Sequence, residues 1–259
     1  MEYFEKIEKN PYEDLYWNLP EKKQGKVNII GGNTKNFRVS IKTAEFLAGK
    51  YPIEKVDVVL PDVLKSQLPS MDFFQFLSST NAGSFAGEGL SDAINSSDYN
   101  LIVGDLSKNN ITGQAVVSAL NSAEKPVILT RDTLDLIAEN NPEKLLTNEN
   151  IILFGSMPQI QKIFRAVYYP KMLLLSQPLN QVAEILHKFT LSYQVKIVTL
   201  CNGQILVAEE GTVKAIALEK SGYSPIMFWS GEAAAKIMTL NLFNPNDFIK
   251  ATVAGIFNV

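Results

Sequence analysis

Three residues near the C-terminal end, Ser230, Gly231 and Glu232, combine residue types that could bind an anion and transfer a proton. They follow a short apolar run and precede three alanines, which indicates the start of a helix. The first N–H groups of a helix have no intrahelical partner and, with the helix dipole, attract a phosphate. A carboxylate beside it can act as general base toward a hydroxyl group. We therefore predict Ser230 and Gly231 as anion-binding residues and Glu232 as the acid/base. Alternatively, Ser230 only caps the helix and Glu232 only complements its dipole.

A second group of polar residues follows two glycines in "IIGGNTKN" (29–36). Here Gly32, Asn33 and Asn36 are candidates for substrate contact, because polar groups after a strand face the ligand side of an open α/β sheet. The alternative is a Gly-Gly turn that Asn and Thr side chains cap. The glycines lack the G-x-G-x-x-G spacing of a dinucleotide site.

Two further segments also place polar residues after a strand-like run. In "VGDLSKNN" (103–110), Gly104 and Lys108 are candidates for nucleotide phosphate binding, with a solvated, Asn-capped turn as the alternative. Asp132 follows "VILT" and is a second candidate catalytic residue. It could equally be a first-turn acid of a helix beside Thr130.

Reactive side chains of other types are scarce. Cys201 is the only cysteine and His187 the only histidine, so zinc clusters and Ser-His or Cys-His relays lack most of their ligands. We expect no metal site built from such clusters. His187 has helical spacing with apolar neighbours and is predicted to pack, and Cys201 is predicted to be a small buried residue. A chain that cannot form an intrachain disulfide is typical of the cytoplasm.

Composition excludes several classes of protein. Of the 259 residues 46% are hydrophobic and 20% charged, as in an ordinary globular protein. The formal charge of −3, without any cluster of Lys or Arg, argues against a nucleic-acid partner. No apolar run reaches the roughly 18 residues that a membrane span needs, and the charged N-terminus is unlike a signal peptide.

Apolar runs alternate with helical segments along most of the chain, which predicts βαβ units and a parallel sheet covered on both faces. The segment 204–218 contains two β-runs joined at Gly211 and predicts a hairpin at the sheet edge. The last helix is expected to begin at Asn244-Pro245. The expected strands are 26–30, 55–60, 73–77, 100–106, 126–130, 149–155, 171–175 and 195–200, and the expected helices are 37–49, 111–120, 157–168, 179–192, 231–241 and 246–257.

We expect one domain, residues 25–259, preceded by an N-terminal arm, residues 1–24. The arm is polar with interspersed aromatic residues in "YFEKIEKNPYEDLYW". It would pack either on a neighbouring subunit, as in a homo-oligomer, or on its own sheet edge.

From Gly25 onward the order of elements resembles the ribokinase-like superfamily, in particular the ADP/ATP-dependent NAD(P)H-hydrate dehydratases, which repair nicotinamide nucleotides. "GKVNIIGGN" resembles their opening strand and Gly-Gly turn, and "WSGE" stands where the superfamily has Gly-Thr-Gly-Asp, its anion hole and catalytic aspartate. "LIVGDLSKN" stands in place of their Gly-Pro-Gly-Leu-Gly loop, and "PVILTRDTLDLI" in place of Val-Leu-Asp-Ala-Asp-Ala-Leu. The resemblance implies a three-layer α/β/α fold with a mainly parallel sheet, ATP or ADP with Mg²⁺, Glu232 as acid/base and Gly231 in the anion hole.

Other positions depart from the family pattern, so two classes of function remain. Trp229 replaces a glycine, and Cys201 stands at the position of a lysine. The first class is a nucleotide-dependent enzyme, either a dehydratase of this kind or a small-molecule kinase that phosphorylates an alcohol. The second is a non-catalytic protein that binds a nucleotide or a partner on the same fold. Further departures lie at Asp105, Thr130, Ser156 and Gln159.

Overall fold

The structure is a computed structural model that describes residues 2–257. Within these residues ten strands form one sheet in the order β1-β10-β9-β8-β7-β6-β5-β2-β3-β4. Only β9 is antiparallel to its neighbours; every other adjacent pair is parallel. The strands are β1 (Phe4–Ile7), β2 (Gln24–Gly31), β3 (Ile53–Pro61), β4 (Phe74–Leu77), β5 (Tyr99–Gly104), β6 (Val127–Thr130), β7 (Ile151–Ser156), β8 (Lys196–Cys201), β9 (Gln204–Glu209) and β10 (Thr212–Ala217).

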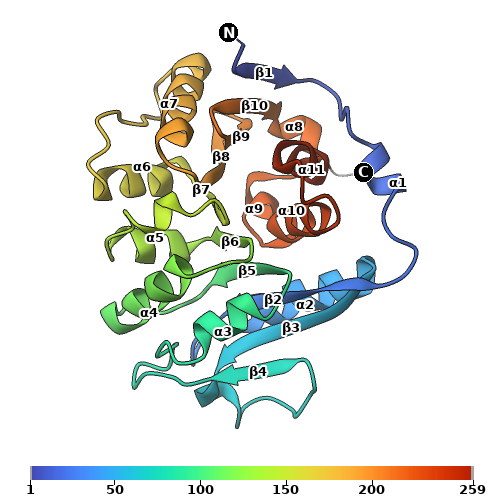
Figure 1. Cartoon of the computed structure of the whole chain (residues 1–259), viewed down its shortest axis with the longest axis vertical. Coiled ribbons are helices and arrows are strands. Elements are labelled where there is room, and N and C mark those ends of the chain that lie inside the picture. The colour runs from blue at the N-terminus through green and yellow to red at the C-terminus, as the bar shows by residue number, and fades with distance from the viewer. Residues whose placement is uncertain (1, 258–259) are drawn as a thin grey trace.

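Helices cover both faces of the sheet, as Figure 1 shows, so the predicted three-layer α/β/α architecture is confirmed. One face carries α3 (Leu90–Asn95), α4 (Asn110–Asn121), α5 (Asp132–Ala138), α6 (Met157–Ala166) and α7 (Leu179–Ser192). The other carries α2 (Arg38–Lys50), α8 (Leu218–Ser221), α9 (Pro225–Phe228), α10 (Glu232–Phe243) and α11 (Phe248–Ile256). The remaining helical segments are α1 (Asp14–Trp17) and the 3₁₀ turns Asp62–Leu64 and Leu145–Thr147.

The central strands are apolar at almost every position because both of their faces are covered. In β5, Leu101 and Ile102 are both fully buried but lie in cores on opposite sides of the sheet. Two buried polar side chains in these strands have partners in the last turn of α3: Asn28 Nδ2 donates to the carbonyl oxygen of Ala93 at 2.6 Å, and Asn100 Nδ2 to that of Ile94 at 2.9 Å. None of the helices in residues 2–257 has the length and apolar character to span a bilayer.

Three details of the predicted elements are wrong. Residues 171–175 form no strand, because Leu173 alone among them is buried and its amide donates to the side chain of Gln161. The last helix begins at Phe248, where Asp247 accepts a hydrogen bond from the Lys250 amide at 3.0 Å, while Asn244 ends α10. The hairpin of β9 and β10 is not at the edge, because β1 pairs with β10.

The N-terminal arm packs on its own chain. Beyond β1, the Tyr16 hydroxyl donates to the carbonyl oxygen of Ala254 at 3.1 Å, and Leu15 and Leu19 pack with Tyr16 on a small apolar cluster of α10 and α11. Strand β1 covers the sheet edge by pairing with β10, as in the second alternative, whereas the segment around Tyr16 packs on helices α10 and α11. A further role of the arm in a homo-oligomer stays a prediction.

A buried lysine lies where the arm meets α10. Lys236 is 3% exposed, and its ammonium lies 5.6 Å from the ring centroid of Tyr16 and 5.7 Å from that of Tyr223. Burial, with a smaller contribution from the charge of Lys50, lowers the pKa of Lys236 to about 8. Its charged form is therefore disfavoured in the folded protein.

We expect this burial to give a stability that rises with pH. Between the folded pKa of about 8 and the ordinary value of 10.5, the unfolded chain holds more protons, so the free energy of unfolding increases with pH. Lys236→Met, which removes the charge and keeps the length of the side chain, should flatten this rise. The full effect is on the order of 3 kcal/mol. Urea unfolding of both proteins from pH 7.5 to about 9.5, below the ionisation of ordinary tyrosines, measures it; parallel pH curves would contradict the prediction.

Candidate functional site

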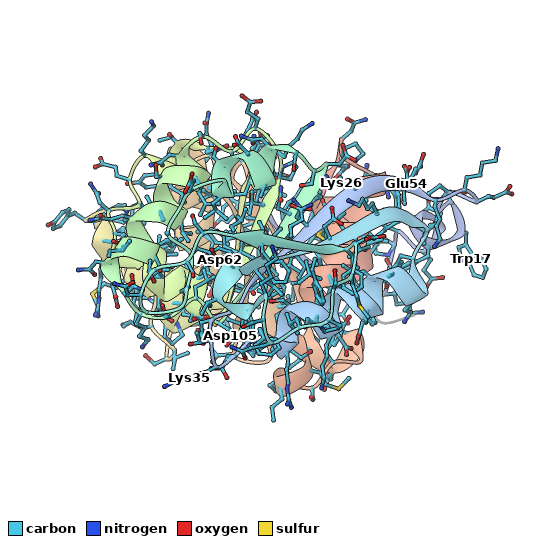
Figure 2. The ribbon with its side chains drawn as sticks, turned by 90° about the horizontal axis from the view of Figure 1, so that it is seen from below. Trp17, Lys26, Lys35, Glu54, Asp62 and Asp105 are labelled. Atoms are coloured by element: carbon cyan, nitrogen blue, oxygen red, sulfur yellow. The ribbon has the colours of Figure 1, made fainter. Side chains whose placement is uncertain are left out.

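The carboxyl ends of the parallel strands bring most of the predicted polar residues to one edge of the sheet. Strand β2 ends at the Gly31-Gly32 turn, β5 at Gly104, and β6 directly before Arg131 and Asp132. Figure 2 shows Asp105 and Asp62 near this edge, with Lys35 beyond them, and Lys26 and Glu54 toward the opposite edge. Open α/β sheets bind their ligands at the carboxyl edge.

Asp132 holds the loop that follows β5. Its Oδ1 accepts a hydrogen bond from the Asp105 amide at 2.7 Å, and its Oδ2 accepts one from the Leu106 amide at 3.1 Å. Both carboxylate oxygens are thus engaged with the loop in which Gly104 and Lys108 are predicted to bind a phosphate. A phosphate at these two amides would compete with Asp132. Its predicted catalytic role stays a prediction.

Two glycines allow β2, β5 and the start of α5 to approach one another. A Cβ added at Gly31 would lie 2.6 Å from the carbonyl oxygen of Gly104, and a Cβ added at Gly104 would lie 2.2 Å from Oδ1 of Asp132. Gly104 also has a φ of +88°, which a side chain would strain. Gly104 therefore leaves room for the Asp132 carboxylate, which could not otherwise reach the loop.

Asn33 joins the β2 turn to the same loop. Its Nδ2 donates to the carbonyl oxygen of Asp105 at 2.6 Å, and its Oδ1 accepts from the amides of Lys35 and Asn36 at 2.9 and 3.1 Å. The Gly32 amide donates to the carbonyl oxygen of Gly104 at 3.1 Å. The amide group of Asn33 is thus engaged within the protein, while Asn36 is exposed. Their contact with a substrate stays a prediction.

Several residues in these loops have strained backbone conformations. Asp105, Ser107 and Arg131 have φ values of +59°, +24° and +56°, which L-residues seldom adopt. Arg131 Nη2 lies 3.1 Å from Asp105 Oδ1 in an ion pair. Burial raises the pKa of Asp105, the Arg131 guanidinium lowers it, and the Asp132 carboxylate raises it again, with a net upward shift. Strained residues and perturbed carboxyl groups are both common at functional sites.

A second layer of polar contacts supports Arg131. Gln159 Nε2 donates to the carbonyl oxygen of Arg131 at 2.7 Å and to Asp135 Oδ2 at 2.9 Å. Burial acts to raise the pKa of Asp135, but hydrogen bonds from Lys162 and Gln159 and the charges of Lys162 and Lys108 hold it below its ordinary value. Lys108 itself is exposed. The sequence analysis did not propose Arg131 or Asp135 as site residues.

The sequence contained one pattern, a capping box, that indicated part of this arrangement of polar contacts. Ser156 and Gln159 have the spacing of a capping box, and both hydrogen bonds of that motif are formed at the start of α6. No local pattern indicates that the Gln159 amide also reaches Arg131 and Asp135, because these contacts depend on β6 and β7 being neighbours.

The start of α10 lies at the carboxyl edge. A Cβ added at Gly231 would lie 3.1 Å from Thr43 Oγ1 in the first half of α2, whereas a Cβ added at Gly25, near the start of β2, would meet the Leu242 side chain at 3.1 Å. Helix α10 thus runs antiparallel to β2. Its N-terminus points to the end of the sheet that carries the loops of Asp105 and Asp132.

This helix terminus keeps free hydrogen-bond donors. Gly231 is the N-cap with a φ of +105°, and the Ser230 hydroxyl donates to the Met227 carbonyl oxygen at 2.7 Å, so Ser230 does not cap α10. Within residues 2–257, the amides of Glu232, Ala233 and Ala234 have no hydrogen-bond partner; Ala233 and Ala234 are fully buried, and Glu232 is at the surface. The Glu232 side chain is exposed and forms no hydrogen bond or ion pair with that part of the chain.

The apolar residues before this terminus divide between core and surface. Phe228 is fully buried, and the Trp229 ring packs edge-on against Phe154 of β7, with ring centroids 5.3 Å apart. Ile226 and Met227 of the short helix α9 are 84% and 45% exposed. Phe228 and Trp229 therefore pack in the core, whereas Ile226 and Met227 lie at the surface of α9, which contacts α10.

The remaining polar candidates are structural. His187 stacks on Tyr3 with ring centroids 4.0 Å apart, and its Nδ1 contacts the carbonyl oxygen of Gly211. Cys201 is buried, and this burial raises the pKa of its thiol. The Thr130 hydroxyl donates to the Ile102 carbonyl oxygen at 3.1 Å. Among residues 2–257, no three His, Cys, Asp or Glu side chains are grouped to hold a metal ion.

No protein-family model and no curated protein matches the chain. Solved structures do match it. A ribokinase-like superfamily protein from Enterococcus faecalis is 13% identical with a TM-score of 0.68, covering 99% of this chain and 86% of its own. Hydroxyethylthiazole kinase from Pyrococcus horikoshii is 13% identical with a TM-score of 0.54, covering 95% and 80%. Adenosine kinase from Anopheles gambiae, in complex with a diadenosine tetraphosphate, is 10% identical with a TM-score of 0.51, covering 97% and 90%. The chain has the ribokinase-like fold, which it shares with small-molecule kinases.

Proposed function

We propose that this protein is a nucleotide-dependent enzyme that transfers a phosphoryl group to a hydroxyl group of a small molecule at the start of α10. One observation carries the proposal: unpartnered amides and the free carboxylate of Glu232 lie together at the carboxyl edge of a ribokinase-like sheet. Backbone amides at a helix terminus bind phosphate without the help of side chains. The fold neighbours include kinases, one of them in complex with an adenine nucleotide.

Each group has a definite chemical task in this scheme. The amide of Glu232 would hold an oxygen of the transferred phosphoryl group, and the positive end of the α10 dipole would stabilise the charge that develops there. Glu232 would accept the proton of the attacking hydroxyl group. ATP or ADP would supply the phosphoryl group. Mg²⁺ would arrive on the nucleotide phosphates, since this ion needs only one or two protein carboxylates.

The more specific proposal is an NAD(P)H-hydrate dehydratase. There the acceptor is the hydroxyl group of the hydrated nicotinamide ring, and loss of the phosphate restores the ring. The resemblance of "GKVNIIGGN" and "WSGE" supports this acceptor. Any kinase that phosphorylates a small alcohol would use the same donor groups.

One observation favours the alternative, a protein that binds a nucleotide or a partner without catalysis. In the loop after β5, the amides of Asp105 and Leu106 are occupied by Asp132. That loop therefore offers a phosphate fewer free donors than α10 does. A binding protein would still show a nucleotide effect at α10 but no turnover.

Thermal unfolding with and without millimolar ATP, ADP and Mg²⁺ tests the anion site. A nucleotide at about 100 times its dissociation constant should add about 2.7 kcal/mol of stability, a shift of roughly 5 to 10 °C. Gly231→Trp should abolish the shift, because the indole would cover the free amides. Gly203→Trp is the matched control: Gly203 also has a positive φ of +73°, and nothing lies within 4 Å of its Cβ position. A shift that survives in Gly231→Trp, or no shift in the wild type, would contradict the proposal.

A further inference from the structure

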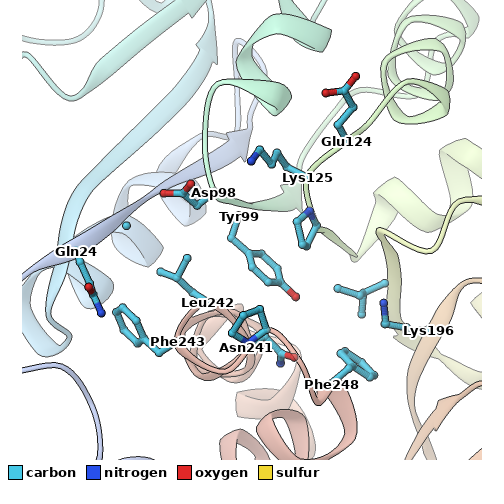
Figure 3. A pocket seen from close by; sticks show the side chains of 14 residues that line it. Gln24, Asp98, Tyr99, Glu124, Lys125, Lys196, Asn241, Leu242, Phe243 and Phe248 are labelled. Carbon is cyan, nitrogen blue, oxygen red and sulfur yellow. The ribbon is translucent and has the colours of Figure 1, made fainter.

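A cavity lies at the opposite edge of the sheet, away from the site described above. It has a volume of about 580 Å³ and opens at the amino ends of β2, β5, β6 and β8, below the turn that joins α10 to α11. Figure 3 shows its side chains converging on one space from the strand ends and the two helices. A volume of this size suits a small-molecule ligand.

The floor of this cavity offers one donor and one acceptor. Tyr99 is 4% exposed, and its hydroxyl, which points into the cavity in Figure 3, has no hydrogen-bond partner in the described chain. Asn241 is also 4% exposed; its Nδ2 donates to the Ile237 carbonyl oxygen at 2.8 Å and to Thr252 Oγ1 at 3.1 Å. Its Oδ1 accepts no hydrogen bond in the described chain. Both atoms therefore remain available to pair with a ligand in the cavity.

The walls suit a flat ring. Phe243 and Phe248 stand on either side of Asn241 in Figure 3, and Pro126 and Pro245 complete the apolar lining. The ammonium of Lys196 lies 5.6 Å from the centroid of the Phe248 ring and donates to the Glu149 carbonyl oxygen, so this side of the cavity is held in place. Aromatic rings and prolines pack well against planar heterocycles.

The charges around the opening balance. Asp98 and Glu124 carry two negative charges, and Lys125 and Lys196 carry two positive charges. A rim without net charge gives a phosphate or a carboxylate no general attraction. Gln24 adds a further polar side chain to the lining. Burial raises the pKa of Tyr99, so its hydroxyl stays a hydrogen-bond donor at neutral pH.

We infer that this cavity binds a neutral, planar heteroaromatic molecule of the adenine type. A ring nitrogen would accept the hydrogen bond of the Tyr99 hydroxyl, and an adjacent exocyclic amino group would donate to Asn241 Oδ1. The site is independent of the start of α10, because Leu242 and Phe243 line it at the far end of that helix.

Calorimetric titration with adenosine tests this site. Tyr99→Phe keeps the ring and removes one hydrogen bond, so we expect the dissociation constant to rise about five- to tenfold. Tyr169→Phe, in the aromatic cluster with Phe164 and Phe189, is the matched control and should bind as the wild type does. The variant Gly231→Trp should also bind adenosine unchanged. Loss of binding in Gly231→Trp together with full binding in Tyr99→Phe would place adenosine at α10 and overturn the inference.

Two further probes define the class of ligand. Adenine should bind, since it carries the edge that Tyr99 and Asn241 recognise. Adenosine 5′-monophosphate should bind to Gly231→Trp no more tightly than adenosine does, because the rim offers no net positive charge. Tighter binding of the monophosphate in that variant, or no binding of adenine and adenosine to the wild type, would overturn the inference. Thermal unfolding of Tyr99→Phe establishes that the variant is folded when it is titrated.

Discussion

Replacing Glu232 by glutamine is expected to lower the rate of phosphoryl transfer by about 10²- to 10⁴-fold, the usual contribution of a general base. Glutamine has nearly the same shape but cannot accept the proton of the attacking hydroxyl. Nucleotide binding should persist, because the amides at the start of α10 belong to the backbone. The reaction can be followed as the conversion of hydrated NADH to NADH with ATP or ADP, and as nucleotide consumption with other small alcohols.

The matched control is Glu219→Gln, which removes an equivalent first-turn acid from α8. It should leave the rate unchanged. A Glu232→Gln protein that keeps the wild-type rate would show that another group accepts the proton. A wild-type protein that binds nucleotide at α10 without turning over any of these substrates would support the non-catalytic alternative.

Gly104→Ala is expected to destabilise the protein by about 4 to 7 kcal/mol. The new Cβ would meet Asp132 Oδ1 at 2.2 Å, so the carboxylate must leave the two amides that it now binds. Each hydrogen bond to a charged group contributes about 1.5 to 3 kcal/mol, and an alanine at positive φ costs about 1 kcal/mol more. Urea unfolding of the variant and the wild type measures the difference.

Two controls separate these contributions. Gly203→Ala has a comparable positive φ but no atom within 4 Å of its Cβ position, so it should show only the backbone cost of about 1 kcal/mol. When Asp132 is already replaced by alanine, Gly104→Ala should lower the free energy of unfolding by no more than Gly203→Ala does. Gly104→Ala could instead lower the free energy of unfolding equally in the presence and absence of Asp132. That result would contradict the prediction that Gly104 is needed to make room for this carboxylate.

Much of the fold could be predicted because its strands are buried on both faces. Such strands need continuous apolar runs, and the runs predicted at 26–30, 100–106 and 195–200 overlap β2, β5 and β8; the second extends two residues past the end of β5. The same reasoning failed for residues 171–175, where several apolar residues stand at the surface and only Leu173 reaches the core. An apolar run forms a strand only when a neighbouring strand is available to pair with it.

For the candidate site, local sequence indicated which residues stand at element ends but not which of them meet. The helix start at Gly231 and Glu232 could be predicted because glycine and a first-turn acid have local conformational and electrostatic causes. The bonds from Asp132 to the amides of Asp105 and Leu106 join residues 27 and 26 positions apart. They form because β5 and β6 are neighbours in the sheet.

The sequence by itself therefore determined the alternation of strands and helices, the start of α10 and the scarcity of metal ligands, since each depends on residue type and short-range spacing. Tertiary structure decided that Asp132 occupies the loop after β5, that Glu232 stays unpaired beside free amides, and that Tyr99 and Asn241 meet at one cavity. These contacts depend on strand order and helix direction. Both arise from packing of the whole chain, which no local pattern encodes.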